Sequence, residues 1–207
     1  MIGTALAFAS RLVSGATVVW HCDPRRGGPR VYFGNHSSHL DFILIWSALP
    51  ADLRRSARPV AGRDYWEHGP VRRYLAGRVF HAVLIDRARA GSACDAAAAR
   101  ASIERMAAEL DARHSLIVFP EGTRARDGDV GPFKSGLFHL ARTRPDAELV
   151  PVYLENLNRI LPKGEFLPVP MLSRVVFGRP LATIPGEDKY AFLARAREGL
   201  IHLRSLS

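Results

Sequence analysis

Short apolar runs that alternate with longer segments of helical spacing are the feature that most constrains the fold of this chain. The apolar runs occupy residues 30–34, 57–62, 81–86, 115–120, 148–155 and 173–178. A repeated order of strand, helix and strand is typical of a largely parallel sheet flanked by helices. With 207 residues, the chain is long enough for one sizeable core. We therefore predict a single α/β domain with a largely parallel central sheet.

Two helices and one loop are predicted from their residue patterns. In residues 92–112, a pair resembling a capping box precedes apolar side chains at helical spacing, namely Ser92 and Asp95 followed by Ile103, Met106, Ala107 and Leu110. Residues 187–206 have the amphipathic pattern of a closing helix. Residues 162–170 contain three prolines and a glycine, which predicts an ordered loop.

The N-terminal segment, residues 1–20, is apolar on both sides of Arg11. No uninterrupted run of about 18 apolar residues occurs, so no membrane span is assigned, and the flanks do not resemble a signal peptide. We expect either a helix in the membrane interface, with Arg11 reaching the head groups, or a buried first helix of the domain. The domain prediction is a membrane-interface helix over residues 1–20 and the main domain over residues 21–207.

The charge of the chain is strongly positive, with 29 Lys and Arg against 20 Asp and Glu and a net charge of +9. Arginines concentrate in residues 54–89, which suits an anionic membrane surface or nucleic acid, although a charged run is often only a solvated face. Nucleic-acid binding is the weaker interpretation, because no recognition-helix motif accompanies the patch. Cys22 and Cys94 show no disulfide or zinc pattern, which indicates a reducing compartment.

The stretch GNHSSHLD, residues 34–41, allows three interpretations: a metal site, a catalytic histidine with its orienting carboxylate, or a capped helix start. A zinc site needs three or four converging ligands, and His36, His39 and Asp41 lack a further ligand at suitable spacing. We therefore predict no metal here. A general base needs only one imidazole whose other ring nitrogen is held by a carboxylate.

The spacing of His36 and Asp41 sets a geometric condition on the catalytic interpretation. Five residues of regular helix would leave the two side chains about 140° apart. His36 must therefore lie at or before the start of the helix that carries Asp41, with its ring turned toward that residue. Asn35, Ser37 and Ser38 are residue types that cap such a start. A capped helix with an incidental histidine remains the alternative for this motif alone.

A second group of residues follows another apolar run, in FPEGTR at residues 119–124. Gly122 lets backbone N–H groups approach an oxyanion, Arg124 can grip a phosphate, and Glu121 can bind a hydroxyl or orient Arg124. Arg87 follows the strand-like LID, and Lys134 with Gly136 lies at a predicted helix start in PFKSG. Each arginine alone is more often a surface ion pair. Together they place a candidate base and several cations at the ends of successive strands.

At these residues the chain resembles the glycerolipid acyltransferase family, typified by 1-acylglycerol-3-phosphate (lysophosphatidic acid) acyltransferases. Asn35, His36 and Asp41 match the N-H-x4-D motif of that family. Arg87 matches its second block, FPEGTR its third, and VPVYLEN at residues 150–156 its fourth, with Pro151 as the central proline. The blocks come in the family's order and span most of the chain.

The resemblance implies an O-acyltransferase in which His36, oriented by Asp41, is the general base, without an acyl-enzyme, a metal or a cofactor. The donor would be acyl-CoA or acyl-carrier protein. The acceptor would be a lysophospholipid, most directly 1-acylglycerol-3-phosphate, whose acylation gives phosphatidic acid. The implied location is the cytoplasmic face of the cell membrane, as a peripheral or monotopic protein. The acceptor would be bound by residues of the second and third blocks and the PFKSG turn: Arg87, Glu121, Gly122, Thr123, Arg124 and Lys134.

Two departures from the family pattern leave alternatives open. Family members often have a longer hydrophobic N-terminal anchor, and the second block here is rich in arginine. Related enzymes acylate lyso-ornithine lipids or other lysophospholipids, so the acceptor is not fixed by the motifs. A hydrolase that uses His36 and Asp41 on a thioester or phosphoester is a further alternative, although the chain lacks the G-x-S-x-G elbow of a covalent serine hydrolase.

Overall fold

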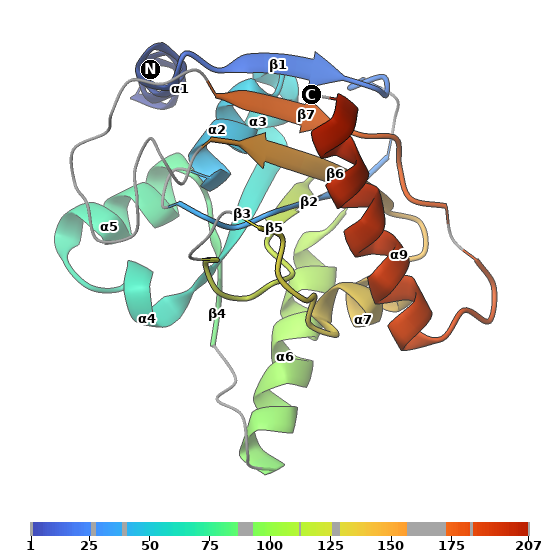
Figure 1. Ribbon diagram of the computed structural model, residues 1–207. Coiled ribbons are helices and arrows are strands. Elements are labelled where there is room, and N and C mark those ends of the chain that lie inside the picture. Colours follow the sequence, from blue (N-terminus) through green and yellow to red (C-terminus); the bar gives the residue numbers. More distant parts are fainter. Residues whose placement is uncertain are drawn as a thin grey trace.

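A seven-stranded sheet forms the centre of the molecule (Figure 1). The computed structural model describes residues 2–25, 28–38, 41–86, 93–111, 113–125, 129–156, 173–182 and 184–206. The strand order is β1-β7-β6-β2-β5-β3-β4. The strands are β1 Thr17–Trp20, β2 Arg30–Gly34, β3 Ala57–Gly62, β4 Val83–Ile85, β5 Ser115–Val118, β6 Glu148–Glu155 and β7 Arg174–Phe177.

All neighbouring strands of this sheet are parallel except β6 and β7, which are antiparallel. The predicted α/β fold with a largely parallel sheet is therefore confirmed. Because parallel strands end at the same edge of a sheet, the segments that follow β2, β3, β4, β5 and β6 begin at one edge. The chemistry-bearing motifs of the sequence lie in these segments.

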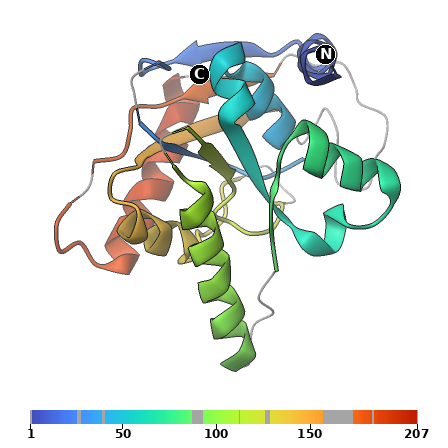
Figure 2. The ribbon, with the colours of Figure 1, turned by 180° about the vertical axis from the view of Figure 1, so that it is seen from behind.

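Helices cover both faces of the sheet, as the two opposite views show (Figures 1 and 2). One face carries α1 Ile2–Ser14, α2 Asp41–Ala48, α3 Ala51–Ser56, α4 Arg63–Trp66 and α5 Pro70–Tyr74, the last running into the π-helical turn η1 Leu75–Val79. The other face carries α6 Ala93–Glu109, α7 Gly136–Thr143 and α9 Lys189–His202, which ends in the 3-10 turn η2 Leu203–Leu206.

The buried strand β2 illustrates why these residues form the centre of the sheet. Side chains of a strand point alternately to its two faces. Val31 and Phe33 pack with the layer of α6, α7 and α9, whereas Tyr32 packs with the layer of α2. All five residues of β2 are buried, which fits the continuous apolar pattern of a strand covered on both faces.

The structure differs from the sequence prediction mainly at the N-terminus. The helix expected over residues 1–20 is α1, which ends at Ser14. Residues Thr17–Trp20 form the edge strand β1 of the main sheet. The β-branched Thr17, Val18 and Val19 favour a strand, and Gly15, with a φ of 52°, separates it from the helix. The predicted loop at residues 162–170 lies outside the described residues.

Candidate active site

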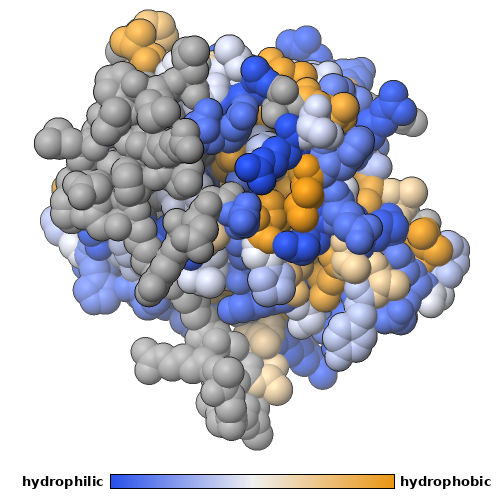
Figure 3. Space-filling view, viewed as in Figure 1, coloured by the Kyte–Doolittle hydropathy of each residue, from blue (hydrophilic) through white to orange (hydrophobic). Residues whose placement is uncertain are grey.

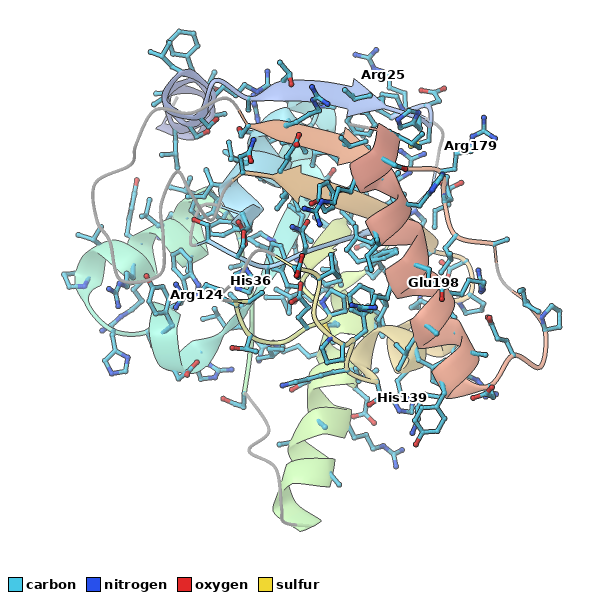
Figure 4. All side chains as sticks on the ribbon, viewed as in Figure 1. Arg25, His36, Arg124, His139, Arg179 and Glu198 are labelled. Carbon is cyan, nitrogen blue, oxygen red and sulfur yellow. The ribbon has the colours of Figure 1, made fainter. Side chains whose placement is uncertain are left out.

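The two sequence motifs meet at the ends of the neighbouring strands β2 and β5. His36 follows β2, and the FPEGTR turn follows β5, which pairs with β2 in parallel register. The backbone N–H of His36 donates to Glu121 Oε1 at 2.9 Å, and the N–H of Ala125 donates to the His36 carbonyl at 2.8 Å. His36 and Arg124 accordingly lie in the same region in Figure 4. The predicted convergence of the two motifs is thus present in the structure.

His36 and Asp41 form a hydrogen-bonded pair. The distance from His36 Nδ1 to Asp41 Oδ2 is 2.7 Å. Asp41 is the first residue of α2, and His36 precedes this helix, as the spacing argument requires. The carboxylate accepts from Nδ1–H, which leaves Nε2 as the ring nitrogen that can take a proton.

Asp41 is fully buried and is held from three sides. Its Oδ2 also accepts the backbone N–H groups of Ser37 at 2.6 Å and Ser38 at 2.8 Å. Burial raises the pKa of the Asp41 carboxyl, and the hydrogen bonds from His36, Ser38 and Ser37 offset part of this effect. The other oxygen, Oδ1, is buried without a hydrogen-bond partner among the described residues. This carboxylate is a fixed orienting group that solvent does not reach.

The ring of His36 stacks on Phe119, with centroids 4.4 Å apart and planes 20° apart. Its side chain is 23% exposed. None of the described residues forms a hydrogen bond with Nε2, so the basic nitrogen is available to a ligand. Phe119 belongs to FPEGTR, but sequence reasoning assigned no role to it, because the stacking depends on the position of the adjacent strand.

Glu121 holds the loops around the site together, and no hydrogen bond or ion pair joins it to Arg124 in the described structure. Besides accepting from His36, it accepts the N–H of Gly131 through Oε2 at 3.1 Å. The residue is 5% exposed. Burial raises the pKa of its carboxyl, and the two backbone donors oppose that effect. Glu121 with these two N–H groups is called the clamp below.

The cations expected to bind a phosphate lie around Gly122. An added Cβ at Gly122 would fall 2.8 Å from Lys134 Nζ, so the lysine side chain lies against this glycine. Gly122 has a φ of 69°, and its N–H is used within the turn, donating to the Phe119 carbonyl at 3.0 Å. Thr123 is exposed. Arg124 Nη1 is buried without a partner among the described residues. Because an unpaired buried cationic donor is costly, Nη1 would gain from a hydrogen bond to an anion.

Some predicted positions lie elsewhere or outside the described structure. Asn35, expected to cap the helix, instead pairs with the backbone of β6: it donates to the Leu154 carbonyl at 2.9 Å and accepts the Leu154 N–H at 2.8 Å. Arg87 and His39 lie outside the described residues. Within the described ranges, no three His, Cys, Asp or Glu side chains are grouped so that they could hold a metal ion.

The arginine-rich segment does not form a single patch. Arg58 lies at the start of β3, at the sheet edge opposite the active site, and bonds to Glu109 and His114. Arg63 lies after β3 and pairs with Glu67 and Asp86. Three further arginines lie on α5 and η1, namely Arg72, Arg73 and Arg78. Sequence proximity therefore overstated the local charge density.

The geometry above can be set beside known proteins. A family model described as "Acyltransferase" matches residues 17–155, which include both motifs. The chain belongs to the acyltransferase family. Within this family, the chain is 31% identical over 157 residues to a 1-acyl-sn-glycerol-3-phosphate acyltransferase of Limnanthes douglasii, covering 74% of this chain and 50% of that protein.

A human relative and a crystal structure are also similar to this chain. It is 30% identical over 177 residues to human 1-acyl-sn-glycerol-3-phosphate acyltransferase alpha, covering 84% of this chain and 58% of the human one. It therefore spans about half the length of these relatives. The crystal structure of the 1-acyl-sn-glycerophosphate (LPA) acyltransferase PlsC from Thermotoga maritima superposes with a TM-score of 0.74 at 20% identity, covering 99% of this chain and 78% of that one. This likeness shows the fold.

Proposed function

We propose that this acyltransferase-family chain transfers a fatty acyl group from an acyl thioester to the free hydroxyl of a lysophospholipid, with 1-acylglycerol-3-phosphate as the first acceptor and phosphatidic acid as the product. The observation that carries the proposal is the His36–Asp41 pair, with its second ring nitrogen open to a ligand and an unpaired buried guanidinium nitrogen on the adjoining turn. The names of the relatives support the choice of acceptor.

The proposed reaction needs only one proton carrier. Nε2 of His36 takes the proton of the acceptor hydroxyl as its oxygen attacks the thioester carbonyl carbon. The C–S bond then breaks, and the thiolate that leaves takes the proton from the imidazolium as free thiol. Asp41 keeps the imidazole in the productive tautomer and stabilises its charged form, and no acyl-enzyme forms.

The acceptor phosphate would be held by the cations beside Gly122. Arg124 offers its unpaired Nη1, Lys134 offers Nζ, and Thr123 is exposed in the same turn. Arg87, in the second block, is proposed as a further cation on the strength of the family motif. Charge-assisted hydrogen bonds of this kind are shorter and stronger than neutral ones. Glu121 would support the phosphate site by holding its loop in the clamp.

Helix α1 has the two faces that a protein working on membrane lipids needs. Ala7 is buried, and Gly3 lies against α2, with its added Cβ 3.2 Å from the Trp46 ring. Phe8 and Leu12 are 69% and 73% exposed, and a hydrophobic group protrudes at the corner of α1 in Figure 3. Exposed apolar side chains next to Arg11 support binding to an anionic membrane surface. Among the described helices, none is both long and apolar enough to cross a membrane.

The proposal is tested by measuring free thiol released with a panel of acceptors, using both acyl-CoA and acyl-carrier protein as donors. The highest kcat/KM is expected with 1-acylglycerol-3-phosphate, and a low value with monoacylglycerol, which lacks the phosphate. Thiol release without any acceptor would support a hydrolase instead. A preference for lyso-ornithine lipid would keep acyl transfer but overturn the proposed acceptor.

The proposed binding of the acceptor phosphate by Arg124 is tested separately by Arg124→Ala. Loss of a charge-assisted contact should raise the KM for the acceptor about ten- to one-hundredfold. Arg179→Ala is the matched control, because Arg179 is exposed and lies far from His36 in Figure 4. If Arg124→Ala changed only the KM for the acyl donor, the assignment of Arg124 to the acceptor phosphate would be contradicted.

A further inference from the structure

A groove lined by cationic side chains runs along α5 and η1, outside the residues assigned above. Two cavities lie there, of about 420 Å³ and about 660 Å³, and both are lined by Arg73 and Gly77. Ligand sites for small molecules commonly enclose roughly 300–1,000 Å³. We call this pair of cavities the cationic groove. Its remaining lining is Glu67, Pro70, Tyr74, Ala76, Arg78, His81, Ala82 and Leu84.

The described residues do not balance the charge of the cationic groove. Arg78 and His81 are exposed and form no hydrogen bond or ion pair with the described residues. Among the described residues, the hydrogen bond that Arg73 makes is a long one, of 3.5 Å, to the Glu67 carbonyl. The carboxylate of Glu67 is already paired with Arg63 at 2.8 Å. The groove therefore presents exposed guanidinium groups that form no ion pair with the described residues, and such groups suit phosphate oxygens.

The backbone of the groove wall departs twice from regular structure. Residues Leu75–Val79 form a π-helical turn, and His81 has a φ of 48°, in the left-handed region that side chains other than glycine seldom adopt. Both features are uncommon and occur often at functional sites. An added Cβ at Gly77 would meet nothing within 4 Å, so the groove is open at its middle.

The groove wall is packed against the helix that carries Asp41. Phe80, at the end of η1, lies edge-on to Phe42 with centroids 4.9 Å apart, and Trp66 of α4 lies edge-on to the same ring at 5.6 Å. Phe42 directly follows Asp41 in α2. A ligand in the groove is therefore bound by elements that also contact the first turn of the catalytic helix.

We infer that the cationic groove binds the phosphorylated nucleoside end of a CoA thioester. A nucleoside phosphate combines a flat base with anionic groups, and the groove combines the half-exposed ring of Tyr74 with Arg73 and Arg78. A simple phosphate would leave the aromatic ring unused. The inference rests on the proposed acyl transfer, because that reaction requires a thioester donor, and it names acyl-CoA as that donor.

The direct test is equilibrium binding of adenosine 3′,5′-bisphosphate to the full chain and to Gly77→Glu. The new carboxylate enters open space in the middle of the groove, and the dissociation constant should rise about tenfold or more, as expected when a charge-assisted contact is lost. Gly199→Glu is the matched control, because Gly199 is also helical and open within 4 Å but lies on α9. Arg78→Ala provides a second variant at an exposed position and should weaken binding in the same direction.

A kinetic comparison separates this site from the reaction itself. The ratio of kcat/KM for acyl-CoA to kcat/KM for acyl-pantetheine, which lacks the nucleotide, should fall about tenfold in Gly77→Glu. Unchanged bisphosphate binding in both groove variants would overturn the inference. Loss of binding to phosphatidic acid vesicles with unchanged bisphosphate binding would also overturn it and assign the groove to lipid. If the wild-type chain bound the bisphosphate but showed no acyl transfer, the proposed function would be refuted, whereas the assignment of the groove to a nucleotide would stand.

Discussion

The turn that carries the His36–Asp41 pair and the wall that forms the cationic groove are built in opposite ways. Around His36, buried carboxylates fix the loops through backbone N–H groups, with Asp41 holding Ser37 and Ser38 and Glu121 completing the clamp. Along α5 and η1, the side chains of Arg72, Arg73 and Arg78 are exposed, and none of them forms an ion pair with the described residues. This difference fits the proposed roles, because proton transfer over a short distance needs a fixed geometry, whereas attraction of an anion needs only accessible charge.

Apart from loss of the general base itself, the largest expected effect comes from removing the charge of Asp41. Asp41→Asn removes the negative charge that aligns the Nδ1–H donor and stabilises the imidazolium, and kcat should fall by about three orders of magnitude. The rate of thiol release measures this, and circular dichroism checks the fold. Asp52→Asn is the matched control, because that carboxylate is exposed on α3. Retention of more than a tenth of the wild-type kcat in Asp41→Asn would contradict the orienting role.

The next effect in size is expected from Glu121→Gln, which breaks the clamp and lowers the stability of the folded protein. An amide cannot accept from both backbone N–H groups, so the free energy of unfolding should fall by about 1–3 kcal/mol. The control is Glu198→Gln, because Glu198 is exposed on α9, as Figure 4 shows. Urea denaturation measures both variants, and equal stability of the two would refute the clamp.

The pH dependence of the clamp gives a second readout of the same variant. Burial raises the pKa of Glu121 above its ordinary value of 4.5. A carboxyl with a raised pKa stabilises the folded protein fully below its ordinary pKa and loses that contribution as the pH rises through the folded pKa. The deficit of Glu121→Gln relative to the wild type should therefore be larger at pH 5 than at pH 8. A deficit that grows with pH would contradict the raised pKa.

The smallest effects are expected from alanine substitutions at two glycines, one beside the proposed phosphate site and one away from it. Gly122 and Gly186 both have positive φ, 69° and 77°, but only Gly122 lies against Lys134. Substitution by alanine should cost about 1–2 kcal/mol of stability at each position because of backbone strain. Only Gly122→Ala displaces the lysine and should raise the acceptor KM. An equal acceptor KM in the two variants would remove Lys134 from the proposed phosphate site.

The sequence predicts the fold and the pairing of His36 with Asp41 well because both depend on local spacing. Alternating apolar runs place β2 and β5, and helix geometry alone requires His36 to precede α2. The clamp could not be predicted in the same way, because its partner at Gly131 is a backbone N–H without a sequence signal. The charge density of the arginine-rich segment was overestimated because residues close in sequence need not be close in space. Arg58 and Arg63 lie at opposite ends of β3 and therefore at opposite edges of the sheet.

Acceptor-dependent release of thiol from acyl-CoA by His36→Ala, compared with the wild type, tests the central claim most directly. Removal of the general base should lower kcat by about 10²–10⁴ with 1-acylglycerol-3-phosphate as acceptor. His139→Ala is the matched control, because His139 is exposed on α7 and lies away from His36 in Figure 4. The account predicts near-complete loss in the first variant and none in the second. Normal turnover by a folded His36→Ala protein would contradict it.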